Sequence, residues 1–556
     1  RDRSVSRGLG DVYKRQGWQQ RLQVLTIFSL FLKGKDMNLK AGNSAKNMNP
    51  IICADFPEPD VIRVGDTYYM ICATMHFFPG GTLLKSYDLV HWEIAAHVFE
   101  RLDDTPAEQL EGEQSIYGKG MWAASLRYHK DTFYVCFASY DTGKTYIYRT
   151  KNINEPWEKR SLDGVYHHPS LLFDEDGRIY MGYGFNEVRI LELNDTLTAP
   201  KEGGFERLLV EEKQDAYISY EGAHFYKKDG TYYIFVIQWL KGNLTQREQL
   251  CLYGDSLDGE FKKEMVFSEN LGFPMKGVAQ GGIVDTPEGD WYSVMYQEHG
   301  AIGKMPVLVP VSWDKKRPVF GDNGKMPAEI RVKSTRPYYV YTPVFSSEIF
   351  EETLDGKGRI KPVWQWNHEP DAALWEQTKR GGYRITTGKI SVNLIQAVNT
   401  LTQRAMYPES TVEVTLDPSD LKDGDFAGLC VLQGCYGWIG VTREYGRYYI
   451  VMWNRKLQDC MFHELAPDYM PGTEGFRVPY GGDDIRLKIH VDFTNMRDMA
   501  EIFYRSGNRW QRVGSHRLYF KLDHFMGCRY GLFAYSTAKT GGSAEFYDFA
   551  YRVENI

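Results

Sequence analysis

The sequence predicts an all-β protein, a five-bladed β-propeller followed by a β-sandwich of the concanavalin-like kind. Long helical periodicity is scarce after residue 50, and short alternating runs separated by Gly, Asp and Asn turns dominate. One hairpin pattern recurs five times in the first part of the chain. The 556 residues are too many for one ordinary core, so two domains are expected. The 38 Tyr and 13 Trp favour strands and sugar-binding surfaces over helices.

Each copy of the hairpin begins with one residue before an alternating apolar run, then has a tight turn and an aromatic-rich run. The copies are EPDVIRVGDTYYMICAT from Glu58, ASLRYHKDTFYVCFAS from Ala124, HPSLLFDEDGRIYMGYG from His168, EGAHFYKKDGTYYIFVIQ from Glu221 and QGGIVDTPEGDWYSVMYQ from Gln280. They start about 44 to 66 residues apart, a spacing typical of propeller blades. A β-sandwich built from repeated hairpins is the alternative, and the regular period favours the propeller.

The innermost strand of each propeller blade lines the central axis. If the repeats superpose, their first residues gather around one funnel, and the carboxylates of Glu58 and Glu221 face the same pocket. Two carboxylates across a pocket are the minimum for glycoside hydrolysis, because one protonates the leaving oxygen and the other activates water. The repeats therefore indicate a sugar-cleaving site at the axis.

Composition excludes some classes of function. The net charge is −7 and no basic stripe is present, which argues against nucleic acid as a partner. None of the eight cysteines forms a CxxC pair, so neither a zinc cluster nor a disulfide framework is expected, and the redox compartment stays open.

The first 48 residues are treated as a segment outside the domains. Residues 1–16 (RDRSVSRGLGDVYKRQ) look like translated sequencing adaptor and are left out of the fold argument. Residues 23–32 (QVLTIFSLFL) read as the apolar region of a signal peptide, which predicts a secreted or periplasmic protein, although an A-x-A cleavage pattern is missing. The segment is too short to span a bilayer, so no membrane association is expected. If the chain starts at Met37, the export signal is lost and a cytoplasmic location follows.

At this point the sequence resembles glycoside hydrolase family 43, in the branch of β-xylosidases and α-L-arabinofuranosidases with a C-terminal sandwich. The resemblance runs over nearly the whole chain from Asn49. It rests on NPIICADFPEPDVIRVGDTYYM, YGKGMWAASLRYH, HHPSLLFDEDGRIYMGYG, YEGAHFYKKDGTYYIF, GVAQGGIVDTPEGDWYSVMYQ and GKMPVLVPVSWD. It implies an inverting mechanism with an Asp base in the first blade, a Glu acid in the fourth and a further Asp that tunes the acid's pKa.

Carried over by motif, the general acid is Glu221, in its EG-x-H context. The base position is Glu58 and the pKa-tuning position is His168, and the family has Asp at both. Lys304 stands before the PVLVPV strand, where Arg is usual. Glu58 keeps base chemistry with one more methylene, whereas a neutral His168 removes the anion that would keep Glu221 protonated. We therefore expect weakened acid catalysis, and the departures from the family pattern indicate relaxed selection or a different substrate.

Other members of the pocket are expected from the repeats. Each aromatic ring among them could equally be core packing between blades. Gln280 takes a place where many relatives have a His near a bound ion, so no metal site is expected. The candidate substrate-binding residues are Trp122, His76, Phe77, Trp239, Gln280 and Lys304.

The propeller is expected over residues 49–321, a linker over 322–346 and the β-sandwich over 347–556. Short strands such as STVEVTL and DIRLKIHVDF with Gly, Asp and Asn turns predict the sandwich. Trp364 and Trp366 are expected in the core or between the domains. A structural calcium ion in this domain is an option that no motif supports, and hydrolysis needs no cofactor.

The leading hypothesis is an exo-acting inverting glycosidase that removes terminal α-L-arabinofuranosyl or β-xylosyl residues from hemicellulose oligosaccharides, with activity weakened at Glu58 and His168. The runner-up is a catalytically inactive propeller that binds pentose-bearing glycans. A protein-interaction platform is third, and no sequence feature supports it. The sequence leaves the choice between arabinose and xylose open, together with linkage and oligomeric state.

Overall fold

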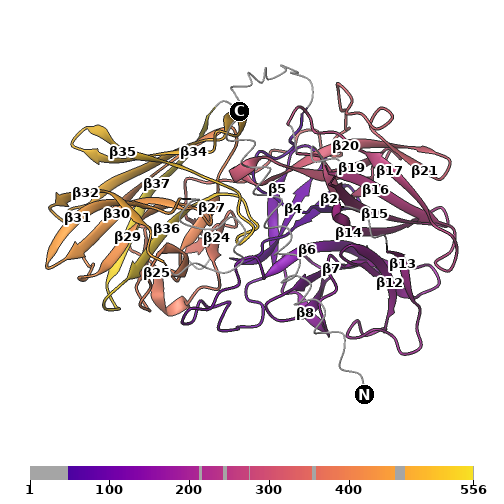
Figure 1. Ribbon diagram of the computed structural model, residues 1–556, viewed down its shortest axis with the longest axis horizontal. Coiled ribbons are helices and arrows are strands. Elements are labelled where there is room, and N and C mark those ends of the chain that lie inside the picture. Colours follow the sequence, from indigo (N-terminus) through magenta and orange to yellow (C-terminus); the bar gives the residue numbers. More distant parts are fainter. Residues whose placement is uncertain are drawn as a thin grey trace.

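The computed structural model describes residues 48–211, 216–241, 247–273, 276–353, 358–456 and 470–554. A propeller and a sandwich lie side by side, with the sandwich in orange and yellow and the propeller in indigo to rose (Figure 1). The adaptor-like residues 1–16, the apolar residues 23–32 and Met37 lie outside the described residues. Within the described ranges, the structure contains no helix whose length and apolar character would suit a membrane crossing, and the seven cysteines there are free.

Five four-stranded antiparallel sheets form the blades, as the repeats predict. The strands of blades 1 to 3 are β1 (Asp60–Val64), β2 (Thr67–Cys72), β4 (Gly80–Ser86) and β5 (Glu93–Phe99); β6 (Met121–His129), β7 (Thr132–Ser139), β8 (Lys144–Thr150) and β9 (Glu158–Asp163); β10 (Ser170–Phe173), β11 (Ile179–Tyr183), β12 (Glu187–Leu193) and β13 (Glu206–Glu211). Those of blades 4 and 5 are β14 (Ala216–Lys228), β15 (Thr231–Leu240), β16 (Glu248–Gly254) and β17 (Lys262–Phe267); β18 (Ala279–Asp285), β19 (Trp291–Glu298), β20 (Lys304–Asp314) and β21 (Arg317–Phe320), with the 3-10 turn η1 (Gly300–Ile302) between β19 and β20.

Apolar clusters between neighbouring blades hold the propeller together. The alternating strands place Phe99 and Phe137 on facing sheets of blades 1 and 2, with ring centroids 5.4 Å apart. Blades 5 and 1 close the ring through the ion pair between Arg63 and Asp285, at 2.5 Å. The radial arrangement of the blades leaves only short strand edges at the axis and at the periphery.

Local irregularities of the inner strands direct particular side chains toward the axis. The antiparallel register shifts between Met121 and Ala124 in β6, around Glu221 in β14 and between Ala279 and Gly282 in β18. Such bulges add a residue to one strand and re-aim its side chains, and they are over-represented beside active sites.

The start of the repeats also carries left-handed backbone at residues other than glycine. Glu58, His168 and Gln280 have φ values of 56°, 48° and 59°. This region costs free energy for residues with a Cβ and persists where the surrounding structure imposes it, which is common at functional sites. Gly222 follows Glu221 at φ 77°, and a Cβ there would lie 2.7 Å from the Gln280 side chain, so only glycine fits.

The second domain is a sandwich of two antiparallel sheets. One sheet has the order β3 (Phe77–Phe78), β24 (Trp364–Asn367), β27 (Leu401–Arg404), β36 (Arg529–Ser536), β29 (Asp425–Leu432), β30 (Gly437–Glu444), β31 (Arg447–Asn454) and β32 (Thr473–Tyr480). The other has the order β25 (Trp375–Gln377), β26 (Tyr383–Thr386), β37 (Ser543–Glu554), β28 (Glu409–Asp417), β33 (Ile485–Asp492), β34 (Met499–Ser506) and β35 (Arg509–Arg517). The small pair β22 (Phe350–Glu352) and β23 (Gly358–Ile360) precedes them, and short 3-10 turns are η2 (Ala372–Leu374), η3 (Leu394–Gln396) and η5 (Thr494–Met496).

The two domains share a sheet and a core. Strand β3 leaves blade 1 and pairs with β24, so that Phe78 faces Trp366 in register. Trp364 and Trp366 are buried in an apolar cluster that contains side chains of both domains, which confirms that they are core residues. The interface is therefore continuous with the hydrophobic core, and the sandwich is held rigidly beside the propeller.

One buried carboxylate at this interface makes stability depend on pH. Asp498 accepts a hydrogen bond from the backbone N–H of Ala301 at 3.1 Å, and its second oxygen has no partner. Burial raises the pKa of Asp498 to about 6, against 3.8 for the free side chain. A raised pKa favours the protonated form in the folded state, so its contribution is complete below pH 4 and is lost as pH rises through 6. The loss is about 3 kcal/mol at most.

Asp498→Asn is therefore expected to flatten the decline in stability between pH 4 and pH 7 and to raise Tm at pH 7. Thermal unfolding of the parent and of Asp498→Asn across this pH range measures the effect. The other carboxylates titrate in both proteins, so the difference between the two Tm curves reports Asp498 alone. Parallel curves for the two proteins would contradict the assignment.

Candidate active site at the propeller axis

Six of the nine residues predicted for the site meet at the propeller axis. They are linked by a chain of contacts that joins all five blades to the sandwich. The residues are Glu58, Trp122, His168, Glu221, Gln280 and Lys304.

Glu58, at the base position, is held by a cation. Lys304 Nζ lies 2.8 Å from Glu58 Oε1, and both side chains are only 3% exposed. Burial lowers the pKa of Lys304, but the Glu58 carboxylate outweighs burial and raises it above its usual value, so the ammonium stays charged. Lys304 thereby fixes the position of the Glu58 carboxyl group at the axis, although a single ammonium lacks the bidentate geometry of arginine.

Glu221, at the acid position, is bound by a histidine that the sequence argument did not single out. Nε2 of His167 lies 2.9 Å from Glu221 Oε1, and Nε2 of His168 lies 4.0 Å from the same oxygen. Nδ1 of His167 in turn lies 2.5 Å from the hydroxyl of Tyr140. The signal in the sequence was the first His of the HHPS segment, which stands directly before the predicted position.

These neighbours favour the ionised form of Glu221. Burial alone raises the pKa of Glu221, but the hydrogen bond that it accepts from His167 outweighs burial and lowers the pKa. Burial, with His167 beside it, holds the pKa of His168 well below its usual value, so His168 is neutral at pH 7 and the His167 hydrogen bond dominates. A general acid must be protonated before it acts, so this arrangement weakens acid catalysis.

His168 occupies a network that an aspartate would fill differently. Its Nδ1 lies 3.1 Å from Nε2 of Gln280, and Oε1 of Gln280 accepts a hydrogen bond from Tyr296 at 3.0 Å. Nε2 of His168 has no hydrogen-bond partner. The predicted pKa-tuning position is therefore at the axis and beside Glu221, but it carries no negative charge.

Two aromatic rings cover the same centre. Trp122 lies 5.8 Å from the His168 ring and 4.7 Å from Phe525, which comes from the sandwich. Lys304 Nζ lies 4.8 Å from the Phe525 ring. The sandwich thus contributes a side chain to the axial centre, and periodicity alone could not have found it because the contact joins residues far apart in sequence.

Trp239 lies at the end of β15, farther from the axis than Glu221. The centroid of its ring lies 4.9 Å from that of Tyr217, and the guanidinium of Arg247 lies 5.1 Å from the Trp239 ring. Arg247 pairs with Glu298 at 3.2 Å. Trp239 is partly exposed, so it belongs to the rim of blade 4.

His76 and Phe77 are buried where the propeller meets the sandwich, which matches the alternative of core packing. His76 is 0% exposed and packs against Tyr117, His368 and His524. Phe77 is buried under the guanidinium of Arg529, 3.6 Å from its ring centroid. The cause is that the chain after β2 leaves blade 1 and joins the sandwich sheet, which carries both side chains into the domain interface.

Two further aspartates near Glu58 have structural roles. Asp60 pairs with Arg127 at 2.6 Å and contacts Nδ1 of His224 at 3.0 Å. Burial raises the pKa of Asp60, but Arg127 and His224 outweigh burial and hold it well below its usual value. Asp55 accepts hydrogen bonds from the backbone N–H groups of Lys304 and Gly527. Neither carboxylate has an oxygen free for substrate.

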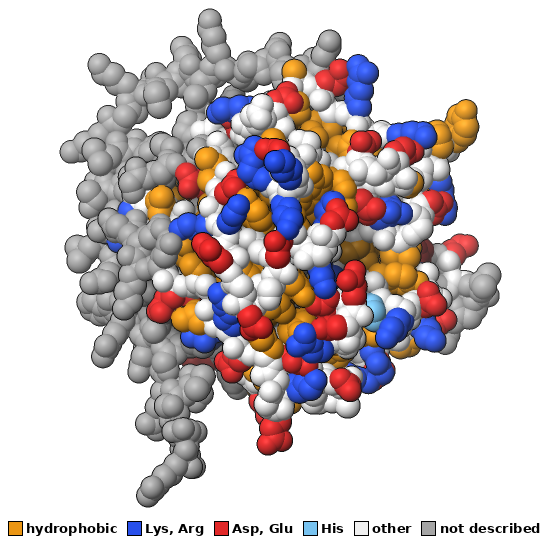
Figure 2. Space-filling model, turned by 90° about the vertical axis from the view of Figure 1, so that its right-hand side faces the viewer, with side chains coloured by type: hydrophobic (Ala, Val, Ile, Leu, Met, Phe, Trp, Pro, Cys, Tyr) orange, Lys and Arg blue, Asp and Glu red, His pale blue; other side chains and the backbone are white. Residues whose placement is uncertain are grey.

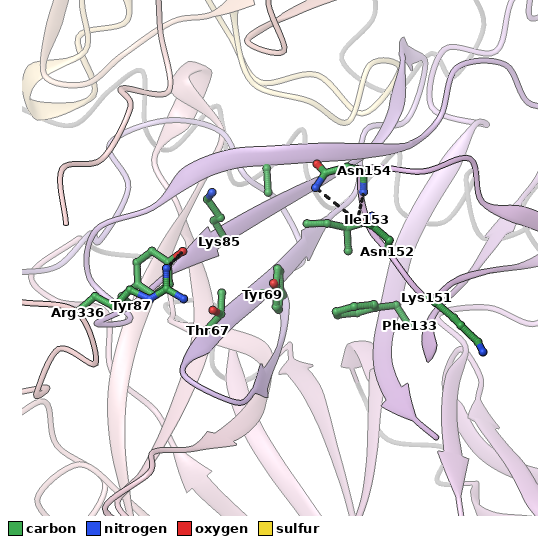
Figure 3. Close-up of a pocket in the computed structure, with 11 residues that line it drawn as sticks. Thr67, Tyr69, Lys85, Tyr87, Phe133, Lys151, Asn152, Ile153, Asn154 and Arg336 are labelled. Carbon is green, nitrogen blue, oxygen red and sulfur yellow. Dashed lines mark hydrogen bonds between the residues drawn. The ribbon is translucent and has the colours of Figure 1, made fainter. Parts of the chain in front are cut away.

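A separate pocket of 310 Å³ lies on the side of blades 1 and 2, and none of the axial residues lines it. Tyr69, Tyr87 and Phe133 form its walls, with Lys85 and Arg336 beside them (Figure 3). On the propeller face in Figure 2, Lys and Arg side chains alternate with Asp and Glu, and no patch of one sign dominates.

Sequence comparison decides the family. The model of "Glycosyl hydrolases family 43" matches residues 47–318, and that of the "Beta xylosidase C-terminal Concanavalin A-like domain" matches residues 356–552. The chain belongs to glycoside hydrolase family 43. Together the two matches cover most of this family 43 glycosidase, and they account for its propeller and its sandwich.

Relatives agree with this assignment. A protein of Formosa agariphila named beta-xylosidase is 28% identical over 458 residues, which are 72% of this chain and 76% of that protein. A non-reducing end alpha-L-arabinofuranosidase of Bacteroides ovatus is 27% identical over 352 residues, 60% of this chain and 63% of that protein. The structure of a bifunctional GH43-CE protein of Bacteroides eggerthii is 36% identical with a TM-score of 0.81, and the match covers 92% of this chain and 64% of that one.

Proposed function

We propose that this family 43 glycosidase removes terminal α-L-arabinofuranosyl or β-xylosyl residues from hemicellulose oligosaccharides by inversion, at a reduced rate. The observation that carries the proposal is the placement of Glu221 on a bulged inner strand, at the propeller axis where Glu58 also lies. Two carboxylates with separate neighbours are what glycoside hydrolysis needs.

In this mechanism Glu221 donates a proton to the leaving glycosidic oxygen, and Glu58 accepts a proton from the water that attacks the anomeric carbon. The carbon–oxygen bond to the leaving group breaks as the bond to water forms on the opposite face. Lys304 orients Glu58, and Trp122 with Phe525 forms an apolar surface suited to the face of a sugar ring. The hydrogen bond from His167 opposes protonation of Glu221, so turnover is slow.

A second function, glycan binding without turnover, is favoured by the same contacts. Both reacting carboxylates already have a basic partner, Lys304 for Glu58 and His167 for Glu221. A site of this kind binds a terminal pentose and fails to cleave it.

Three aryl glycosides test the substrate class: the α-L-arabinofuranoside, the β-xyloside and, as the control sugar, the β-glucoside. We expect nitrophenol release from one or both pentosides and none from the glucoside. Calorimetric titration with arabinose- and xylose-bearing oligosaccharides is run beside the assay. Binding of oligosaccharide without release of product would favour the second function, and neither binding nor release would reject both.

A further inference from the structure

The axial centre holds a group of three side chains that hydrolysis does not use together. His167, His168 and Glu221 each offer one atom, and these three atoms lie within 4.8 Å of one another. The two imidazole rings stack with centroids 4.0 Å apart at an interplanar angle of 15°, so their Nε2 atoms approach the same oxygen of Glu221. Two imidazoles and one carboxylate are a common ligand set for divalent transition metals.

The second observation is a buried nitrogen without a partner. The His168 side chain is 2% exposed, and its Nε2 forms no hydrogen bond. Buried polar atoms in proteins are almost always paired, so an unpaired one calls for a specific cause. Because Nε2 lies 4.0 Å from Glu221 Oε1, an ion held between the two would satisfy it.

The outer neighbours of the two histidines also suit metal ligands. Nδ1 of His167 lies 2.5 Å from the Tyr140 hydroxyl, and Nδ1 of His168 lies 3.1 Å from the Gln280 amide. In metal sites the nitrogen that does not bind the ion is typically fixed by such a hydrogen bond, which turns the other nitrogen toward the ion. When Nδ1 of His167 donates to the Tyr140 oxygen, Nε2 of His167 is left with its lone pair. The Gln280 amide faces Nδ1 of His168 with its nitrogen, so a 180° rotation of that amide, which turns its carbonyl to Nδ1 and its NH₂ group to Tyr296, would leave Nε2 of His168 with its lone pair too.

We propose that His167, His168 and Glu221 form a binding site for a divalent first-row transition-metal ion, with Zn²⁺ as its representative. Zinc–ligand bonds of about 2.0–2.2 Å in a tetrahedron place the ligand atoms about 3.3–3.6 Å apart. The 2.9 Å and 4.0 Å distances to Glu221 Oε1 bracket that range, so small side-chain rotations complete the set. Three protein ligands leave a fourth position for water or a sugar hydroxyl.

The ligand set of this site depends on the histidine at position 168. An aspartate there would give one imidazole and two carboxylates, whereas this chain presents two adjacent imidazoles. A metal on Glu221 occupies the oxygen that would donate the proton in hydrolysis. Metal binding and glycoside cleavage therefore exclude each other. This consequence rests on the proposed function, whereas the proposal that the site binds a metal ion does not.

A second group on the sandwich gives an internal control. Glu409, His490 and Glu554 also lie within 4.8 Å of one another, but they are partly exposed and His490 already contacts Thr411 at 3.0 Å. No unpaired buried atom is among them. We therefore expect this group to contribute little to metal binding.

The test is titration of the full, chelator-treated chain with Co²⁺, followed by its visible absorption bands, and displacement of Co²⁺ by Zn²⁺. We expect one equivalent to bind tightly, with bands typical of four- or five-coordinate Co²⁺. His168→Gln and Glu221→Gln are each expected to weaken binding at least 100-fold, because each removes one ligand. His490→Gln is expected to change it less than twofold.

Circular dichroism and Tm measured without metal establish that each variant is folded. If His168→Gln does not fold, Glu221→Gln carries the same comparison, since its isosteric amide preserves packing. Absence of Co²⁺ bands in the parent would overturn the proposal. So would binding that survives His168→Gln and Glu221→Gln, or that is lost in His490→Gln. Because these readouts need no turnover, they stay informative if no pentoside is cleaved.

Discussion

The double variant Glu58→Asp with His168→Asp is expected to cleave aryl pentosides with kcat/KM on the order of 10²–10³-fold above the parent. His168→Asp places an anion beside Glu221, which raises the pKa of Glu221 and keeps it protonated. Glu58→Asp removes the additional methylene and moves the base by roughly 1 Å, a displacement that can change a rate about 100-fold. Steady-state kinetics on the α-L-arabinofuranoside and the β-xyloside measure the gain.

Two controls separate this effect from a change in folding. The single variant His168→Asn has nearly the same shape as His168→Asp without the charge, so it should recover little activity. Adding Glu221→Gln to the double variant should abolish the gain, because the restored anion acts through Glu221. A double variant no faster than the parent would show that positions 58 and 168 do not limit catalysis.

Lys304→Met is expected to destabilise the propeller by about 3–5 kcal/mol, because it leaves the Glu58 carboxylate buried without its cation. The two side chains are each 3% exposed and 2.8 Å apart, so solvent cannot replace the lost partner. The shift in the urea midpoint of unfolding measures the effect, with fluorescence following the propeller transition.

The matched control is the double variant Glu58→Gln with Lys304→Met, which removes both charges. Replacing a whole buried ion pair is often nearly neutral, so the double variant should be closer to the parent than Lys304→Met alone. Lys304→Arg keeps the charge and should cost less than Lys304→Met. Equal stability of Lys304→Met and the parent would mean that the pair contributes nothing to the fold.

The five hairpin repeats were enough to predict the propeller fold. Hairpins with tight turns form blades, because alternate residues of each strand must be buried between neighbouring sheets. Four of the five copies place Glu58, His168, Glu221 and Gln280 at equivalent positions of the repeat. Those positions converge at the axis in the structure, as expected. The hairpin period and the motifs were sufficient to predict these positions because each blade repeats the same strand contacts.

The residues that sequence reasoning missed or left open depend on contacts between distant segments. His76 and Phe77 follow a propeller hairpin in sequence, yet β3 pairs with β24, almost 290 residues later. Phe525 reaches the axis from the sandwich by the same long-range packing. His167 was adjacent to a predicted residue, but only the bend of the chain at His168 shows that both rings approach Glu221.

The central claim is that Glu221 is the proton donor of a working but slow glycosidase. The most direct test is kcat/KM of the parent and of Glu221→Gln on both aryl pentosides from pH 4 to pH 8, with chelator present. We expect measurable turnover in the parent and a loss of at least about 100-fold in Glu221→Gln at every pH. Equal rates for the two proteins, or none in either, would contradict it.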